Sequence, residues 1–401
     1  MTKQLKLKAA STAAVLVTAL PVIAGPNDGE ILAPEQNNNG NWFDNIGTVY
    51  SNDDNPYIQS LKFFGRFQAQ YAYINGDDVN GDSFSEGIDE IRRLRFGAEI
   101  KFLNGFKLKG NVNLIDDDAN SQGGRDFNYQ NFDQLKLSYT QKDILGFDKL
   151  GLTYGRHKVA LGAEAHTSSK KIKTVERAAI SNRVFNGRWT GFTLDFERGN
   201  WEGTLGYFSQ DQTDELGSLA QGSAVYFSSN HSLDHGNVLF DVFWNIDTDE
   251  DSELASYEWA ATLGYETKIG DWEVVADLAI GDNGDEDFAG ADRDGTFWGV
   301  TLTGSRYIIE DKLEFVARYA YQGAEEDEGI RTNSRFFRDN AVEADINGGR
   351  GDSHHSIYAG LNYYFRGDKS KVLFGIEYDN LSTPDGSADA TTLWGAYRFF
   401  F

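Results

Sequence analysis

The 401-residue chain contains no cysteine, so disulfide bonds, thiolate chemistry and metal or iron–sulfur sites with cysteine ligands are excluded. Proline is scarce, at five residues, and after residue 24 no run of about 18 apolar residues occurs, which excludes transmembrane helices. Membrane-spanning strands stay possible, because a β-strand crosses a bilayer in roughly 9–11 residues and needs only one apolar face.

The abundant residues favour β-structure. Glycine occurs 43 times and aromatic residues make up 14% of the chain, with 28 Phe and 19 Tyr, a composition typical of many strands with one apolar face each. Acidic residues outnumber basic ones by 62 to 37, which gives a formal net charge of −25.

The N-terminal residues follow the order of a secretory signal peptide. Lys3, Lys6 and Lys8 precede the apolar stretch Ala13–Leu20, and small residues lead to a plausible cleavage point after Ala24. We therefore expect residues 1–24 to be a signal peptide. Residues 25–60 are polar and rich in Asn and Asp, and we expect them to form an N-terminal arm.

Apolar and polar residues alternate along most of the remaining chain, which is the pattern of strands with one apolar and one wet face. In RRLRFGAEIKF (92–102), Leu94 and Phe96 share one face, and Arg93 and Arg95 share the other. A second alternating segment follows Asn104-Gly105, a dipeptide favoured in two-residue hairpin turns.

The alternation predicts sixteen strands, and short connections alternate with long polar ones, the plan of an outer-membrane barrel with its short turns on the periplasmic side. A soluble β-sandwich is the alternative, but it has no reason to sort its connections by length. We therefore predict an all-β fold, a 16-stranded antiparallel transmembrane β-barrel over residues 61–401, in the cell outer membrane of a Gram-negative organism. The strands are expected near residues 61–73, 91–103, 105–116, 131–140, 148–156, 187–198, 200–210, 221–229, 236–246, 256–268, 271–281, 295–308, 311–322, 353–366, 370–380 and 391–401.

The third long connection, 157–186, contains most of a basic segment, TSSKKIKTVERAAISNRVFNGRW (167–189). A sixteen-stranded barrel leaves an aqueous channel, and we expect this loop to fold inward and narrow it. That position argues against a nucleic-acid site. The candidate constriction-loop and anion-binding residues are Lys170, Lys171, Lys173, Arg177, Arg183 and Arg188.

Basic residues on the first four predicted strands alternate toward the channel side, and because these strands are neighbours they could form a continuous basic strip along the pore wall. Such a strip offers a permeating oxyanion successive places at which to exchange water for N–H donors. The strip consists of Arg66, Arg93, Arg95, Lys101, Lys107, Lys109 and Lys136.

Three stretches, FGRFQAQ, EIRRLRFGAEI and YGRHKVALGAEAHTSSKKIKTVERAAISNRVF, resemble the phosphate-selective porin O/P family. Members have a strand that ends in Gly-x-x-Lys, a Thr-Ser-Ser segment, here residues 167–169, and a Glu-Arg pair, here Glu176-Arg177. The resemblance implies a homotrimer of sixteen-stranded channels whose loop lysines and arginines form an anion-selective constriction. It implies passage of small hydrophilic solutes, with phosphate or related oxyanions preferred.

A general or cation-leaning diffusion porin is the main alternative, because acidic residues also alternate inward and could pair with the basic loop. These acids are Asp195, Glu197, Glu202, Asp241, Glu258, Glu266, Glu273, Asp277, Glu314 and Glu377.

Catalytic and metal-binding motifs are poorly represented in the sequence. No HExxH, GxSxG or Walker motif occurs, so an outer-membrane barrel hydrolase is a less favoured alternative. His354 and His355 are adjacent and would point to opposite faces of a strand. We predict no enzyme activity, no cofactor and no resident metal, although the acidic loop 281–295 could bridge to lipopolysaccharide through divalent cations. The expected partners are small anionic solutes, outer-membrane lipid and lipopolysaccharide, and two further copies of the chain.

Overall fold

The computed structural model describes residues 46–115, 127–184, 187–209, 223–246, 257–284, 293–332, 337–338 and 344–401. The predicted signal peptide and residues 25–45 of the predicted arm lie outside the described residues. Within the described ranges, no helix is long and apolar enough to cross a membrane.

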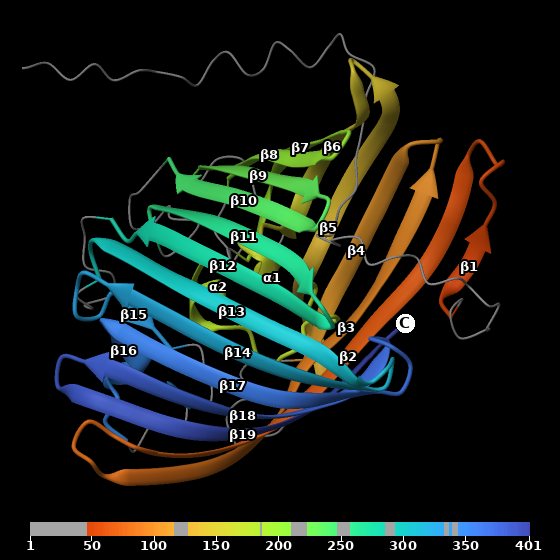
Figure 1. The fold of residues 1–401 in the computed structure, drawn as a ribbon. Helices are drawn as coiled ribbons and strands as arrows, with labels where there is room; N and C mark the ends of the chain where they lie inside the picture. Colours follow the sequence, from red (N-terminus) through yellow and green to blue (C-terminus); the bar gives the residue numbers. More distant parts are fainter. Residues whose placement is uncertain are drawn as a thin grey trace, which may run out of the picture.

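The main sheet has 17 strands, of which sixteen close an antiparallel barrel (Figure 1). Each barrel strand pairs with the next one in sequence, and β19 (Gly386–Phe400) pairs with β2 (Ile58–Asp77) to close the ring. The remaining barrel strands are β3 (Ser83–Phe102), β4 (Phe106–Ile115), β5 (Phe127–Ile144), β6 (Phe147–Lys158), β7 (Arg188–Arg198), β8 (Trp201–Phe208), β9 (Ala224–Leu233), β10 (Gly236–Asn245), β11 (Trp259–Ile269), β12 (Trp272–Asp282), β13 (Thr296–Ile309), β14 (Leu313–Ala324), β17 (Ser353–Tyr364) and β18 (Ser370–Thr383).

The predicted fold class is confirmed, and each of the sixteen predicted strands overlaps one barrel strand. The alternation of apolar and polar residues predicts the strands correctly because one face of each strand must contact lipid. Outward-facing Phe374 and Leu393, for example, expose 59% and 51% of their surface on the barrel exterior, where lipid replaces water as the solvent.

Three details of the predicted connections are wrong. Residues 74–90, expected as a long polar connection between the first two predicted strands, instead form the outer ends of β2 and β3, joined by a short turn. Exposed Ser83 and Ser85 continue β3 where its outer face no longer meets lipid. The turn between β3 and β4, where Asn104-Gly105 predicted two residues, has three, with Leu103 and Asn104 at positive φ. The connection 325–352 contains a small two-stranded sheet, β15 (Ile330–Arg331) and β16 (Arg350–Gly351).

One further strand, β1 (Thr48–Ser51), lies within the predicted arm and pairs antiparallel with the start of β2. The C-terminal residue Phe401 exchanges backbone hydrogen bonds with Gly65 of β2. β1 and β19 therefore use the same edge of β2, one after the other.

Part of the barrel interior is filled by side chains. Trp189, Phe208, Phe243, Tyr257 and Phe297 are buried on the inner face of the wall from β7 to β13, and Trp189 stacks on Phe243 with ring centroids 5.3 Å apart. The short helix α2 (Ala179–Val184) buries apolar side chains in the same cluster. The open part of the lumen is therefore displaced from this wall toward β2–β6.

Candidate functional site

The connection between β6 and β7, residues 159–187, is called the constriction loop here. It contains α1 (Ala163–His166) and α2, and both helices lie within the ring of strands (Figure 1). Arg398 of β19 donates hydrogen bonds to four carbonyl oxygens of the loop, those of Ser169, Ile172, Thr174 and Val175, at 2.5–3.3 Å. These bonds come from a strand that is five positions from β6 in the ring, so they place the middle of the loop across the lumen.

The first residues of the constriction loop bind the acidic wall. The amide of Gly162 donates to Asp241 Oδ2 at 2.8 Å. The amides of Ala163 and Glu164 donate to the two carboxylate oxygens of Asp277, at 2.7 and 3.0 Å. Three successive backbone N–H groups are thereby satisfied by two wall carboxylates.

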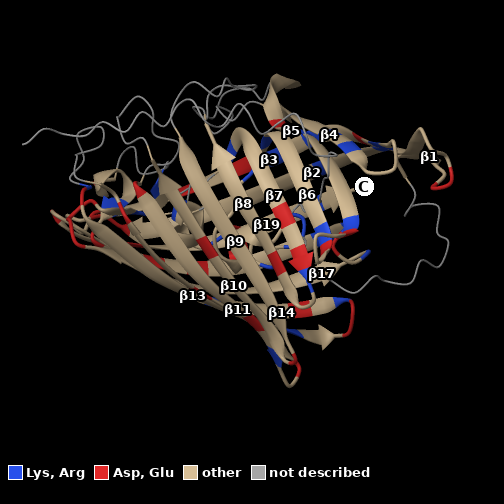
Figure 2. Ribbon diagram, turned by 90° about the horizontal axis from the view of Figure 1, so that it is seen from above, with Lys and Arg blue, Asp and Glu red and all other residues tan. Residues whose placement is uncertain are grey.

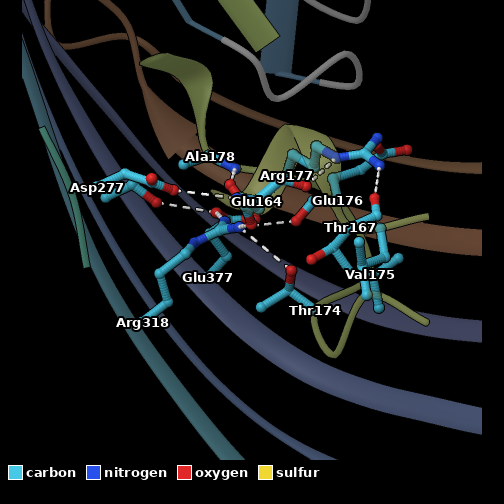
Figure 3. A network of polar contacts seen from close by, with 12 residues as sticks. Glu164, Thr167, Thr174, Val175, Glu176, Arg177, Ala178, Asp277, Arg318 and Glu377 are labelled. Carbon is cyan, nitrogen blue, oxygen red and sulfur yellow. Dashed lines mark hydrogen bonds and ion pairs between the residues drawn. The ribbon is translucent and has the colours of Figure 1, made fainter. Parts of the chain in front are cut away.

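A buried charged network holds the next part of the loop (Figure 3). Arg318 of β14 pairs with loop Glu164 at 3.1 Å and with Glu377 of β18 at 2.7 Å. The guanidinium also donates to the carbonyl oxygen of Glu176 at 2.8 Å. The charges of Glu164 and Glu377 are both paired with Arg318, so losing one partner would leave a buried charge uncompensated and would loosen the loop.

Glu176 holds the loop to the basic side of the barrel. Its carboxylate accepts hydrogen bonds from Arg92 of β3 at 2.9 Å and from Gln70 of β2 at 2.8 Å. Burial acts to raise the pKa of Glu176, but the guanidinium groups of Arg92 and Arg93 outweigh burial and lower this pKa to about 2. The Glu176 side chain is therefore an anion at any physiological pH.

A cleft between the constriction loop and β2–β6 gathers basic side chains. Its volume is about 110 Å³, room for several water molecules or a small oxyanion. Figure 2 shows Lys and Arg bands on strands of this side of the barrel. The cleft is lined by the basic residues Arg66, Arg93, Arg95, Lys109, Lys158, Lys170, Arg177 and Arg188, by Asp133, and by Phe64, Asn111, Gln134, His166, Ser168 and Ser169.

Asp133 is the one carboxylate among the residues that line this cleft. It forms ion pairs with Arg95 at 2.8 Å and with Arg188. Arg66 donates to Ser169 Oγ at 2.6 Å, and Arg93 donates to Gln68 Oε1 at 3.0 Å. Eight basic groups against one acid leave a formal charge of +7 (8 − 1) before His166 is counted.

The structure divides the predicted loop residues between two places. Lys170, Arg177 and Arg188 line the cleft, whereas Lys171 does not. Lys173 crosses to the other wall, where it pairs with Glu273 at 2.5 Å and Glu314 at 2.6 Å.

Arg183 also lies away from the cleft. It donates to the side chain of Asn283 and stacks over Phe297, 4.3 Å from the ring centroid. Of the predicted wall strip, Arg66, Arg93, Arg95 and Lys109 line the cleft. The other three members, Lys101 of β3, Lys107 of β4 and Lys136 of β5, lie outside it.

Arg92 is a residue of the site that strict alternation assigns to the lipid face. A β-bulge in β3 explains the difference: Gln68 pairs with Arg93 and Gln70 with Glu90, so two residues of β3 oppose one of β2. Arg92 and Arg93 then both reach the lumen. The inward position of Arg92 could have been inferred from the sequence, because an arginine side chain facing lipid is energetically unfavourable.

The adjacent histidines point to opposite faces, as predicted. His354 is buried on the inner face, 3.0 Å from Asp379, whereas His355 packs against Tyr321 outside. The nearby Ser356 hydroxyl donates to Glu377 and not to His354. No group of three potential metal ligands occurs in the described ranges.

A closed sixteen-stranded barrel with a long loop folded across its lumen is the architecture of an outer-membrane porin, and comparison with known proteins agrees. The sequence model of the family described as phosphate-selective porin O and P matches residues 61–239, which confirms the family that the motifs indicated. This family and fold point to a channel and not to an enzyme.

Solved structures support the same fold at low sequence identity. The anion-selective porin from Comamonas acidovorans aligns with a TM-score of 0.52 and 13% identity, over 85% of this chain and 99% of that chain. OmpF of Salmonella typhi, in complex with daunomycin, aligns with a TM-score of 0.52 and 14% identity, over 88% and 100%. OprB of Pseudomonas putida aligns with a TM-score of 0.52 and 11% identity, over 85% and 94%. No curated protein matches the sequence.

Proposed function

We propose that this porin is a passive channel that prefers small anions, with phosphate and related oxyanions as the solutes it is built to pass. The observation that carries the proposal is the cleft between the constriction loop and β2–β6, where eight lysine and arginine side chains face one carboxylate. A permeating anion meets these groups where the loop narrows the lumen.

The basic side chains of the cleft are arranged to let an anion pass through and not to hold it. Arg66, Arg93 and Arg95 come from two adjacent strands, so an oxyanion can pass from one guanidinium fork to the next. Asp133 occupies donors of Arg95 and Arg188, which keeps these sites from binding an anion too tightly to release it. Several moderate sites allow an anion both to enter and to leave.

The acidic wall is the observation that favours a general or cation-leaning porin instead. Much of this wall is engaged by the protein itself. Asp241 and Asp277 bind loop amides, Glu314 pairs with Lys173, and Glu377 pairs with Arg318. These carboxylates therefore attract a passing cation less strongly than their number suggests.

The sequence of the N-terminal residues and the family suggest the remaining parts of the proposal. The mature protein would begin after residue 24, with residues 25–60 as a polar arm before the barrel, and it would assemble as a homotrimer. Outer-membrane lipid and lipopolysaccharide would surround the apolar exterior. Chemical cross-linking of the detergent-purified protein measures the oligomeric state directly, and a monomer would contradict the trimer.

Block of chloride current by phosphate tests the proposed solute preference. Phosphate added to one side of a planar bilayer should reduce chloride current through the wild-type channel, because both anions use the same cleft. Lys170→Glu should weaken this block, since Lys170 lines the cleft. Lys142→Glu is the matched control: it makes the same change of charge on exposed Lys142 at the turn end of β5. Equal effects of the two variants, or no block of the wild type, would contradict the proposal.

A further inference from the structure

Two acids of the wall opposite the cleft hold the beginning of the constriction loop. Asp241 of β10 and Asp277 of β12 expose 0% and 6% of their surface. Asp241 accepts a hydrogen bond from the amide of Gly162, and Asp277 accepts hydrogen bonds from the amides of Ala163 and Glu164. Asp241 also lies 3.0 Å from His166 Nε2. These carboxylates face the loop and not the open lumen.

The local sequence is shaped for this contact on both sides. Gly162 has φ +83°, a conformation that residues with a side chain rarely adopt, and this turn directs successive amides toward the wall. On the wall, a Cβ at Gly264 of β11 would lie 2.8 Å from Asp277 Oδ1 and 3.2 Å from Ala163 Cβ. A glycine on each surface therefore permits the close approach.

The same short segment of the loop also holds two bases of the cleft. Lys158 Nζ donates to the carbonyl oxygen of Ala165. Arg177 donates to the carbonyl oxygens of Glu164 at 2.9 Å and Thr167 at 2.7 Å. Residues 162–167 thus lie between the acidic wall on one side and the cleft bases on the other.

We infer that Asp241 and Asp277 are positioning residues for the selectivity of the channel: by holding residues 162–164 against the wall, they keep Lys158 and Arg177 in the cleft. This inference rests on the proposed anion preference. A positioning role and a purely electrostatic role predict opposite changes in anion preference when the acid is removed. Removing a wall acid that faces open water favours anions, whereas removing Asp277 loosens the cleft and disfavours them.

Two amide variants separate these effects, because each removes one negative charge from the inner wall. Asp277→Asn leaves one acceptor where two amides need acceptors, so the loop loses a hydrogen bond. Glu202→Gln alters an inward-facing residue of β8 that makes no hydrogen bond to the loop among the described residues.

Reversal potentials in a potassium chloride gradient measure the outcome. Asp277→Asn should lower the chloride-to-potassium permeability ratio roughly sixfold, because moving away one unit charge about 8 Å from an ion in water changes the chloride and the potassium permeability by about 2.4-fold each, in opposite directions. Glu202→Gln should raise the ratio or leave it unchanged. An increase of the ratio in Asp277→Asn, matching that of Glu202→Gln, would overturn the inference.

A reversible cross-link tests whether Asp277 acts through the loop position. Because the chain has no cysteine, Ala163→Cys and Gly264→Cys can be combined with Asp277→Ala, which also removes the oxygen nearest the new side chain. The Cβ separation of 3.2 Å is slightly shorter than the roughly 3.5–4.5 Å found in disulfides, so a small shift of the loop away from the wall allows the bond to form. Oxidation by diamide should restore the wild-type permeability ratio, and reduction by dithiothreitol should lower it again.

The cross-linked variant also distinguishes the two proposals. A permeability ratio that stays low in the oxidised form would overturn the positioning role, because the loop would be held and the selectivity still lost. If the wild-type channel favours potassium, the proposed function fails. In that case a reversible rise in single-channel conductance on reduction still supports the attachment of the loop to the wall by Asp277, and an unchanged conductance contradicts it.

Discussion

Replacement of Glu176 by Gln should release the middle of the constriction loop. The pKa of this carboxyl falls from 4.5 to about 2 in the folded protein, which corresponds to about 3 kcal/mol of stabilisation of the charged form at neutral pH. Its side chain is 10% exposed, so little of this energy is lost to solvent screening. Gln keeps the shape and loses the charge, and Arg92 and Arg93 are left facing one another.

Hydrogen exchange of the loop amides is the suitable assay. A loss of about 3 kcal/mol should speed exchange over residues 168–178 by on the order of a hundredfold, with the amides of β10–β14 unchanged. Glu202→Gln serves as the control, because it also removes one acid from the lumen. Equal exchange in the two variants would refute the account of how the loop is held.

The pH dependence has a definite sign. Because the folded pKa of Glu176 lies below its ordinary value, its stabilisation is complete above about pH 4.5 and is lost as the pH falls toward 2. After correction for intrinsic exchange rates, loop protection in the wild type should fall within this window. In Glu176→Gln it should be low throughout and nearly flat.

Two further substitutions test other parts of the structure. Lys173→Met should accelerate amide exchange at residues 170–175, because it leaves Glu314, 1% exposed, without its cation, at a cost of about 3–5 kcal/mol. Exchange like that of the wild type would contradict a structural role for this lysine. Trp189→Ala should lower the thermal unfolding temperature in detergent, since it removes a fully buried ring that stacks on Phe243, at a cost of about 3–5 kcal/mol. An unchanged unfolding temperature would show that the apolar cluster under α2 does not stabilise the barrel.

The fold could be predicted from the sequence because the lipid imposes a rule on every strand separately. Leu94 and Phe96 must face outward whatever their neighbours are, so a period of two is visible in each segment without knowledge of the others. The outer parts of β2 and β3 escaped prediction for the same reason. Beyond the lipid, Ser83 and Ser85 are free of the rule, and a polar strand there resembles a loop.

The site was only partly predictable, because its geometry depends on contacts between distant residues. Arg66 and Lys170 have charges and approximate positions that the strand count supplies. Lys173 lies outside the cleft because Glu273 and Glu314, 100 and 141 residues away in the sequence, attract it. Arg92 enters the lumen only because of the bulge in β3.

The reversal potential of the wild-type channel tests the central claim most directly. In a planar bilayer that separates concentrated from dilute potassium chloride, the cleft between the constriction loop and β2–β6 should make chloride more permeable than potassium, although the chain carries a net charge of −25. The account predicts a reversal potential of the sign set by chloride. A reversal potential of the sign set by potassium would contradict it.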